Sequence, residues 1–237
     1  MKTKLIIFDF DGTLGDTRRN IVTTMQMTIA ELRLPKRSEN ECASTIGLPL
    51  GGCFQALFPD MQADMVQCCV DTYRRIFDEN LKDIKPEAFP LVVETLSALK
   101  RRGCMLTIAS SRSNASLVEL VRDMGIADCF SLLIGANDVE KAKPDPEPVL
   151  KTLDILNLLS CKNLIDKGHV VNQESKAYVH ACQALVVGDM AVDILMGANA
   201  GAKTCGVTWG NGTKEELQQA GADYLIDNMD ELLEIIT

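Results

Sequence analysis

The 237-residue chain is poor in the side chains that mark several common classes of protein. It has only two histidines, and its nine cysteines are an odd number without a CxxC pair. Structural zinc sites need closely spaced cysteine and histidine ligands, and disulfide frameworks need paired cysteines. The sequence therefore argues against both, and it predicts free thiols in a reducing cytoplasm.

Long apolar runs and an excess of positive charge are also missing. No stretch is long enough to cross a membrane, and no cleavable signal peptide precedes the first predicted strand. The 24 Lys and Arg residues are outnumbered by 33 Asp and Glu residues, which gives a net charge of −9. We therefore expect neither a membrane nor nucleic acid as a partner. A small anionic substrate is not excluded, because it responds to local charge.

The most informative segment is a short apolar run, Leu5–Phe8, that leads directly into Asp9 and Asp11. Such a run is typical of a strand buried on both faces. Alternate residues of an extended chain share a face, so the two carboxylates can converge, and they would then repel each other. A bound hard cation would offset this repulsion. The alternative is a surface turn, since Asp and Gly form turns, but a turn does not require two acids directly after a buried strand.

The chain divides into two parts that differ in their pattern of apolar residues. Residues 16–85 carry apolar side chains at helical spacing, and no strand is predicted from Gly15 to Lys85. After that, predicted strands and helices alternate, which is the pattern of a parallel sheet with helices on both faces. We therefore predict an α/β fold, a doubly wound parallel sheet of the Rossmann-like kind, formed by residues 1–15 and 86–237. Residues 16–85 are predicted to form an inserted α-helical domain, called the cap below.

The strands predicted in the second part are Met105–Ala109, Leu132–Ile134, Ala184–Val187, Lys203–Val207 and Tyr224–Ile226. In an open parallel sheet, ligands bind at the carboxyl ends of the strands. The polar side chains expected there are those of Asp9, Asp11, Ser110, Ser111, Arg112, Asp189 and Asp193, with Lys143 on a loop before a predicted helix. Acids can hold Mg²⁺, while a hydroxyl and a lysine can hold a phosphoryl group. An aspartate beside both could attack phosphorus as a nucleophile.

Four separated motifs of the chain stand in a recognisable order. They are Asp9-Phe-Asp11-Gly-Thr13-Leu14, Ala109-Ser110, Lys143-Pro144-Asp145-Pro146 and Gly188-Asp189-Met-Ala-Val-Asp193. In these motifs the chain resembles the haloacid dehalogenase-like hydrolase superfamily, and within it the phosphoglycolate phosphatase-like branch with an α-helical cap. The resemblance spans nearly the whole chain.

The resemblance implies a Mg²⁺-dependent phosphatase that hydrolyses a small phosphomonoester through an aspartyl-phosphate intermediate. Asp9 would be the nucleophile, and Asp11 the general acid and base. Lys143 would also be catalytic, and it would bind the substrate phosphate together with Ser110 and Ser111. The implied metal site consists of Asp9, the backbone carbonyl of Asp11 and Asp189, with Thr13 and Asp193 in support.

Single residues help to distinguish a phosphatase from other activities of this superfamily. Asp11 argues against a dehalogenase, which needs no acid to protonate an ester oxygen. A sugar phosphomutase of this superfamily would carry a histidine in the first cap helix, and Asp16–Met25 has none. A pyrophosphatase, a phospho-accepting receiver and a non-catalytic binding protein are further alternatives, although the chain length and the helical insertion argue against a receiver.

The cap would determine which leaving group is accepted. The sequence does not show which of its basic residues lie at the site and which lie on the surface. The adjacent Arg74 and Arg75 are typical of a solvated helix face. Phosphoglycolate, a sugar phosphate, a nucleotide and pyrophosphate are all compatible with the sequence. We expect a small phosphorylated metabolite as the partner, and a monomer or a homodimer.

Two features depart from the family pattern. Leu91 stands where related phosphatases usually have a glycine that opens a helix. The segment Leu158–Gln183 is unusually long for a connection between a helix and a strand, and it holds both histidines, His169 and His180. Because the preceding helix should run away from the carboxyl ends of the strands, we expect this segment to lie far from the site. Neither histidine should then take part in catalysis.

Overall fold

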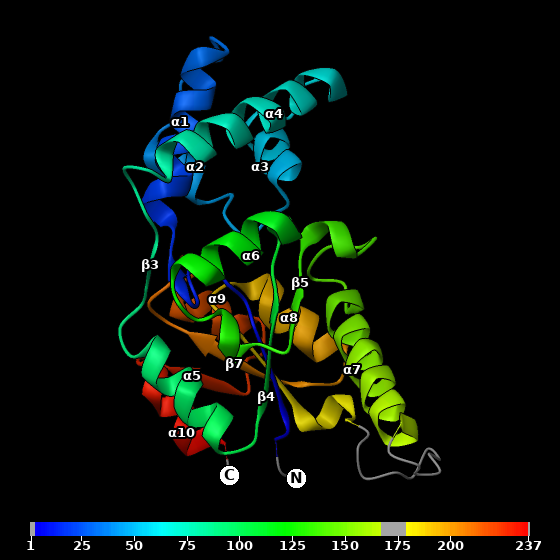
Figure 1. Ribbon diagram of the computed structural model, residues 1–237. Coiled ribbons are helices and arrows are strands. Elements are labelled where there is room, and N and C mark those ends of the chain that lie inside the picture. The colour runs from blue at the N-terminus through cyan, green and yellow to red at the C-terminus, as the bar shows by residue number, and fades with distance from the viewer. Residues whose placement is uncertain (1–2, 167–178, 237) are drawn as a thin grey trace.

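The structure is a computed structural model that describes residues 3–166 and 179–236. It consists of an α/β core and a group of helices that lies on one side of that core (Figure 1). The predicted α/β fold with a doubly wound parallel sheet is confirmed. Within the described ranges, no helix is both long and apolar enough to cross a membrane.

The core is built on a six-stranded parallel sheet in the order β5-β4-β1-β6-β7-β8. Its strands are β1 (Leu5–Phe8), β4 (Met105–Ala109), β5 (Leu132–Ile134), β6 (Ala184–Gly188), β7 (Lys203–Val207) and β8 (Tyr224–Ile226). In the middle of the sheet, Leu5 of β1 pairs with Met105 of β4 on one side and with Ala184 of β6 on the other. The chain adds strands first on one side of β1 and then on the other. The carboxyl ends of β4, β1 and β6 therefore border the crevice in which such sheets bind ligands.

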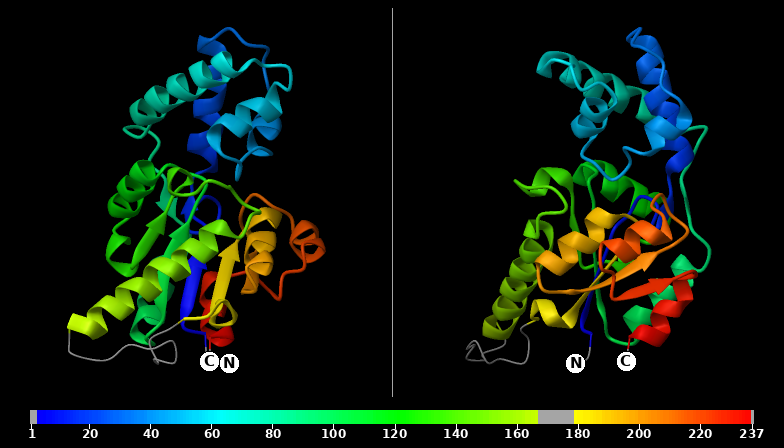
Figure 2. Two further views of the ribbon diagram at one scale, coloured as in Figure 1. Left: turned by 90° about the vertical axis from the view of Figure 1, so that its right-hand side faces the viewer. Right: turned by 180° about the vertical axis from the view of Figure 1, so that it is seen from behind.

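Helices cover both faces of this sheet (Figure 2). They are α5 (Val92–Arg101), α6 (Asn114–Asp123), α7 (Glu147–Asp166), α8 (Ala191–Asn199), α9 (Lys214–Gln219) and α10 (Leu232–Ile235). From β1, Ile6 and Phe8 pack into one apolar cluster with residues of α5, α6 and α10, while Leu5 and Ile7 pack into a second with residues of α7 and α8. Because both faces are buried, every residue of β1 is apolar.

The cap consists of α1 (Arg18–Glu31), α2 (Glu39–Ala43), α3 (Leu50–Leu57) and α4 (Ala63–Asn80). Aromatic side chains hold it together, since Tyr73 packs edge-to-face on Phe54 and stacks on Phe77. A short antiparallel ribbon of β2 (Gly15–Asp16) and β3 (Glu87–Ala88) joins the cap to the core. Four 3-10 turns occur in the described connections, at Ala127–Cys129, Ala136–Asp138, Ala181–Gln183 and Met229–Glu231.

Three elements differ from the sequence predictions. Helix α3 was not predicted, because Gly51 and Gly52 weaken its helical pattern. The expectation of no strand from Gly15 to Lys85 is wrong at β2, since a strand of two residues is too short to leave a pattern. Helix α7 continues to Asp166, so the first part of the long segment Leu158–Gln183 extends the helix. Residues 167–178 of that segment, with His169, lie outside the described residues.

Candidate active site

The ends of three neighbouring strands place the polar side chains. Asp9 follows β1, Ser110 follows β4 and Asp189 follows β6, each as the first residue after its strand. The backbone N–H of Asp9 donates to the carbonyl of Val187 in β6, at 2.8 Å, so the sheet pairing continues into the site. Asp9, Ser110 and Asp189 are all buried.

Lys143 joins two of the acids. Its Nζ donates to Oδ1 of Asp9 at 2.6 Å and to Oδ1 of Asp193 at 2.7 Å, and all three side chains are buried. Burial alone would lower the pKa of Lys143, but the ion pairs with Asp193 and Asp9 raise it above its ordinary value. The lysine is held in place by its loop, because Asn199 donates to the backbone carbonyl of Pro144 at 3.0 Å.

Asp189 lies in a cradle of hydrogen-bond donors. Thr13 donates to its Oδ1 at 3.0 Å, and the backbone N–H of Asn211 donates to its Oδ2 at 2.7 Å. Gly12, at φ +85°, makes room for this carboxylate, because a Cβ there would lie 2.2 Å from Oδ2 of Asp189. Burial, followed by the nearby charge of Asp193, raises the pKa of Asp189 to about 7.

The acids at this point carry more negative charge than the lysine balances. Oxygen atoms of Asp9, Asp189 and Asp193 lie within 4.8 Å of one another. Burial and the neighbouring carboxylates raise the pKa of Asp9 well above its usual range, although Lys143 acts in the opposite direction. With all groups ionised, three carboxylates and one ammonium leave two negative charges, which is what one divalent cation would balance. Hard carboxylate oxygens are the ligands that Mg²⁺ prefers, so the residues present fit a magnesium site.

Asp11 belongs to a second ion pair, away from Lys143. Nε of Arg112 lies 2.8 and 2.7 Å from the two carboxylate oxygens of Asp11, and Thr17 donates to Oδ1 of Asp11 at 2.6 Å. The Arg112 guanidinium lies over the ring of Phe77, 5.0 Å from its centroid, and its Nη2 is buried without a hydrogen-bond partner. Arg112 therefore fixes the position of the second aspartate of the first motif.

The two serines after β4 differ in their surroundings. Oγ of Ser110 accepts a hydrogen bond from the backbone N–H of Arg112 at 3.2 Å and lies on the core side. Oγ of Ser111 donates to the backbone carbonyl of Gly47 at 2.7 Å, and so contacts the cap. Ser110 is thus placed among the strand-end groups, whereas the hydroxyl of Ser111 links the core to the cap.

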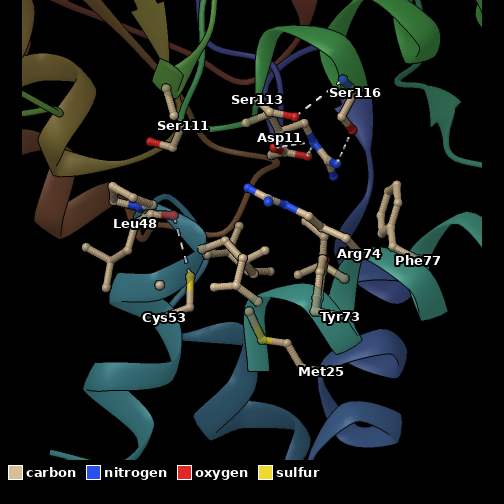
Figure 3. Close-up of a pocket in the computed structure, with 18 of the residues that line it drawn as sticks. Asp11, Met25, Leu48, Cys53, Tyr73, Arg74, Phe77, Ser111, Ser113 and Ser116 are labelled. Carbon is tan, nitrogen blue, oxygen red and sulfur yellow. Dashed lines mark hydrogen bonds and ion pairs between the residues drawn. The ribbon is translucent and has the colours of Figure 1, made fainter. Parts of the chain in front are cut away.

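A cavity of about 640 Å³ lies between the cap and the core. Asp9 and Asp11 line it from the core, and cap residues such as Leu48 and Tyr73 line it from the other side. Figure 3 shows Asp11 and Ser111 on one side of this cavity and Cys53 and Met25 on the other. The acids therefore open onto a space large enough for a small organic molecule.

The structure brings together most of the side chains that the sequence suggested, and adds others. Lys143 joins Asp9 and Asp193 by hydrogen bonds, and Thr13 donates to Asp189. These two sets meet because oxygen atoms of the three aspartates lie within 4.8 Å of one another. The contacts that sequence reasoning missed are those of Thr17, Arg74, Arg112 and Asn211. Arg112 was expected at a strand end without an assigned role, and Arg74 was interpreted as part of a solvated helix face. Thr17 and Asn211 carried no signal in the sequence.

His180 lies at the opposite end of the sheet from this group. It precedes the 3-10 turn Ala181–Gln183, and the carbonyl of Gln183 accepts from the N–H of Lys4, before the start of β1. Asp9 follows the other end of β1. The segment Leu158–Gln183 was expected to lie far from the site. For His180, which is among the described residues, this expectation is confirmed.

Comparisons with known proteins identify relatives of the whole chain. A sequence model of haloacid dehalogenase-like hydrolases matches residues 6–207. The chain is 33% identical over 231 residues to a protein described as the probable phosphatase IndB of Dickeya dadantii, covering 97% of this chain and 91% of that one. It is 29% identical to the pyrophosphatase PpaX of Bacillus pumilus, covering 98% and 95% of the two chains.

A solved structure shares the fold. A protein from Haemophilus somnus described as a predicted phosphoglycolate phosphatase superposes with a TM-score of 0.82 and 24% identity. The match covers 100% of this chain and 99% of that one, so the cap and the core are both included. At this identity the likeness concerns the fold alone.

Proposed function

The chain belongs to the haloacid dehalogenase-like hydrolase family, and we propose that it is a magnesium-dependent phosphatase acting on a small phosphomonoester. The observation that carries the proposal is the buried group in which Lys143 bridges Asp9 and Asp193, beside Asp189. Phosphoryl transfer needs positioning and charge neutralisation more than covalent chemistry by the protein. This group offers both at the mouth of a cavity.

In the proposed first step, a carboxylate oxygen of Asp9 attacks phosphorus and the bond to the ester oxygen breaks. Asp11 gives its proton to the leaving oxygen, so that a neutral alcohol departs. Asp9 is left as an aspartyl-phosphate. Lys143 keeps the attacking carboxylate in position and offsets the negative charge of the phosphoryl oxygens.

In the proposed second step, Asp11 takes a proton from water, and the water oxygen attacks phosphorus. The bond between phosphorus and Asp9 breaks, which releases phosphate and restores the carboxylate. Ser110 would hold phosphoryl oxygens throughout, with Ser111 nearby. Asp9, Asp189 and the backbone carbonyl of Asp11 would hold Mg²⁺, with Thr13 and Asp193 in support. When bound, Mg²⁺ would neutralise charge on the phosphoryl group.

In this proposal residues 16–85 act as a cap over a core of residues 1–15 and 86–237, and a phosphorylated metabolite binds between them. The cytoplasm is the proposed compartment, in line with the thiols of Cys42, Cys53 and Cys205, which are not in disulfide bonds. A pyrophosphatase is the second candidate, because the chain is similar to the pyrophosphatase of Bacillus pumilus.

Phosphate release from a panel of phosphorylated metabolites, with pyrophosphate included, tests the proposal. We expect release in the presence of Mg²⁺, loss of release with a chelator, and recovery when Mg²⁺ is restored. The Asp9→Asn variant, folded by circular dichroism, serves as the blank. Full release after exhaustive chelation would contradict the metal assignment, and no release from any compound would contradict the phosphatase assignment.

A further inference from the structure

We propose that Arg74, on cap helix α4, binds a second anionic group carried by the leaving group of the substrate. The substrate class would then be phosphomonoesters whose leaving group bears a carboxylate or another phosphate. This inference rests on the proposed phosphatase function and adds to it the chemistry that the cap selects.

Arg74 reaches the cavity from the cap. It lines the cavity together with Asp11 and Ser111 of the core. Figure 3 shows its guanidinium extending from α4 into the space below Asp11 and Ser111. Its side chain is 60% exposed, which is consistent with a group that projects into a solvent-filled space.

The guanidinium of Arg74 has N–H donors that form no hydrogen bond with Asp71, its ion-pair partner. The ion pair formed by Arg74 joins Nη1 to Oδ1 of Asp71 at 3.9 Å, which is beyond hydrogen-bond distance. The neighbouring Arg75 has the opposite character. Its Nη2 lies 2.5 and 2.6 Å from the two oxygens of Glu31, and its Nη1 lies 3.0 Å from Glu79. Two adjacent arginines of one helix are therefore divided into one that is paired within the cap and one that is left for a ligand.

Lys143 and Arg112, two cations close to the reacting groups, are both paired with acids. Lys143 donates to Asp9 and Asp193. Arg112 is paired with Asp11, and its Nη2 is buried. Among the described residues that line the cavity, Arg74 is thus the cation without a hydrogen bond to an acid, since its ion-pair partner Asp71 lies 3.9 Å away.

The surroundings of Arg74 indicate that anion binding on the cap side of the cavity would depend on this residue. Much of the cap wall of the cavity is apolar, formed by Met25, Leu48, Val66 and Val70 among others. Two exposed acids, Asp78 and Glu119, also line the cavity, but neither forms an ion pair with Arg74. An apolar wall contributes nothing to binding a carboxylate or a phosphate. The fork of an arginine binds either one through two parallel hydrogen bonds.

Matched substrates test this inference directly. 3-Phosphoglycerate and glycerol 3-phosphate differ by a carboxylate in place of a hydroxymethyl group. 1,3-Propanediol bisphosphate and 3-hydroxypropyl phosphate differ by a second phosphate. Steady-state kcat and KM with Mg²⁺ would be measured for the four compounds and for p-nitrophenyl phosphate. The proteins compared are the wild type, Arg74→Gln, Arg74→Lys and the control Arg75→Gln, which removes the same charge from the neighbouring position.

We expect the wild type to prefer at least one anionic member of the two pairs. The preferred pair identifies the second anion as a carboxylate or a phosphate. Arg74→Gln should lower kcat/KM for that compound about tenfold or more, mainly through KM, since a charge-assisted hydrogen bond is lost. Its neutral counterpart should change by less than about twofold, on the same reasoning. Arg74→Lys should restore part of the loss, and Arg75→Gln should keep the wild-type preference.

Other outcomes separate this inference from the proposed function. Equal kcat/KM for the anionic and neutral members in the wild type would overturn the inference and leave the phosphatase intact. Equal losses on both members in Arg74→Gln would also overturn it, because the residue would then act on the fold or on the reaction in general. No release of phosphate or nitrophenol from any of the five compounds by the wild type would overturn the proposed function, and the inference with it.

Discussion

Three aspartates of the site, Asp9, Asp11 and Asp189, differ in their hydrogen-bond partners. Asp9 is paired with Lys143, whereas Asp11 is paired with Arg112. Asp189 has neutral donors, from Thr13 and Asn211. These differences give the three carboxylates three separate roles in the account: attack on phosphorus, proton transfer and metal binding.

The first prediction concerns the two aspartates of the first motif. Asp9→Asn should abolish phosphate release, because the attacking oxygen is removed while the shape of the side chain is kept. Asp11→Asn should nearly abolish release from alkyl phosphates, because the poor leaving group loses its proton donor. Phosphate release from purified proteins, shown to be folded by circular dichroism, measures both effects. Substantial turnover by folded Asp9→Asn would rule out the proposed nucleophile.

The second prediction assigns Arg112 as a positioning residue that acts through Asp11. Arg112→Met should lower kcat about tenfold or more on glycerol 3-phosphate with little change in KM, because a charged hydrogen bond to the proton donor is lost. Arg112→Lys should recover part of kcat. An unchanged kcat in folded Arg112→Met would show that Arg112 does not position Asp11.

The third prediction concerns the protein without metal. The pKa of Asp189 is 3.8 in its ordinary state and about 7 in the fold, so the folded protein holds this proton more tightly than the unfolded chain. The resulting stabilisation is complete below about pH 4 and is lost as the pH rises to about 7. In chelator, the melting temperature of the wild type should therefore fall relative to Asp189→Asn across this range. Parallel curves for the two proteins would contradict the raised pKa.

At the level of elements, the strands and helices of the core were predictable because their buried faces place apolar residues at regular spacings in the sequence. The run Leu5–Phe8 is apolar since both faces of β1 are covered. Helices α2 and α9 begin at capping boxes, in which Ser38 and Thr213 are each followed three residues later by a glutamate. Helix α3 was not predictable in the same way. Its sequence begins Leu-Gly-Gly, and burial of Phe54 in the cap holds it instead of helix propensity.

The fourth prediction concerns the start of α5. Leu91 precedes this helix with φ 64° and is 43% exposed, at the position where the family pattern has glycine. A left-handed conformation costs a leucine roughly 1–2 kcal/mol, and glycine costs about 0.5–1 kcal/mol in the unfolded chain. Leu91→Gly should therefore raise the free energy of unfolding in urea by up to about 1.5 kcal/mol. Leu91→Ala is the control and should give no such gain, because alanine keeps the strain. A loss of stability in Leu91→Gly would contradict this reading of the turn.

At the level of the whole molecule, the site depends on contacts between distant parts of the chain. Asp9, Asp189 and Lys143 could be predicted because parallel strands end at one edge of a sheet and the motifs mark those ends. The pairing of Arg112 with Asp11 joins residues 101 positions apart and leaves no periodic signal. Likewise, Arg74 and Arg75 are chemically identical in the sequence. The contacts of Arg75 with Glu79 and with Glu31 on α1 distinguish it from Arg74, which lines the cavity.

The central claim is that phosphate passes through Asp9, and trapping it there is the most direct test. The Asp11→Asn protein would be mixed with p-nitrophenyl phosphate and Mg²⁺, quenched in acid and analysed by peptide mass spectrometry. Nitrophenol leaves with little need of a proton donor, while hydrolysis of the intermediate lacks its base, so the phosphorylated enzyme should accumulate. The account predicts one added phosphoryl group on the peptide that contains Asp9, and none in Asp9→Asn. A protein that releases nitrophenol with no phosphoryl group on Asp9, or with one on another residue, would contradict it.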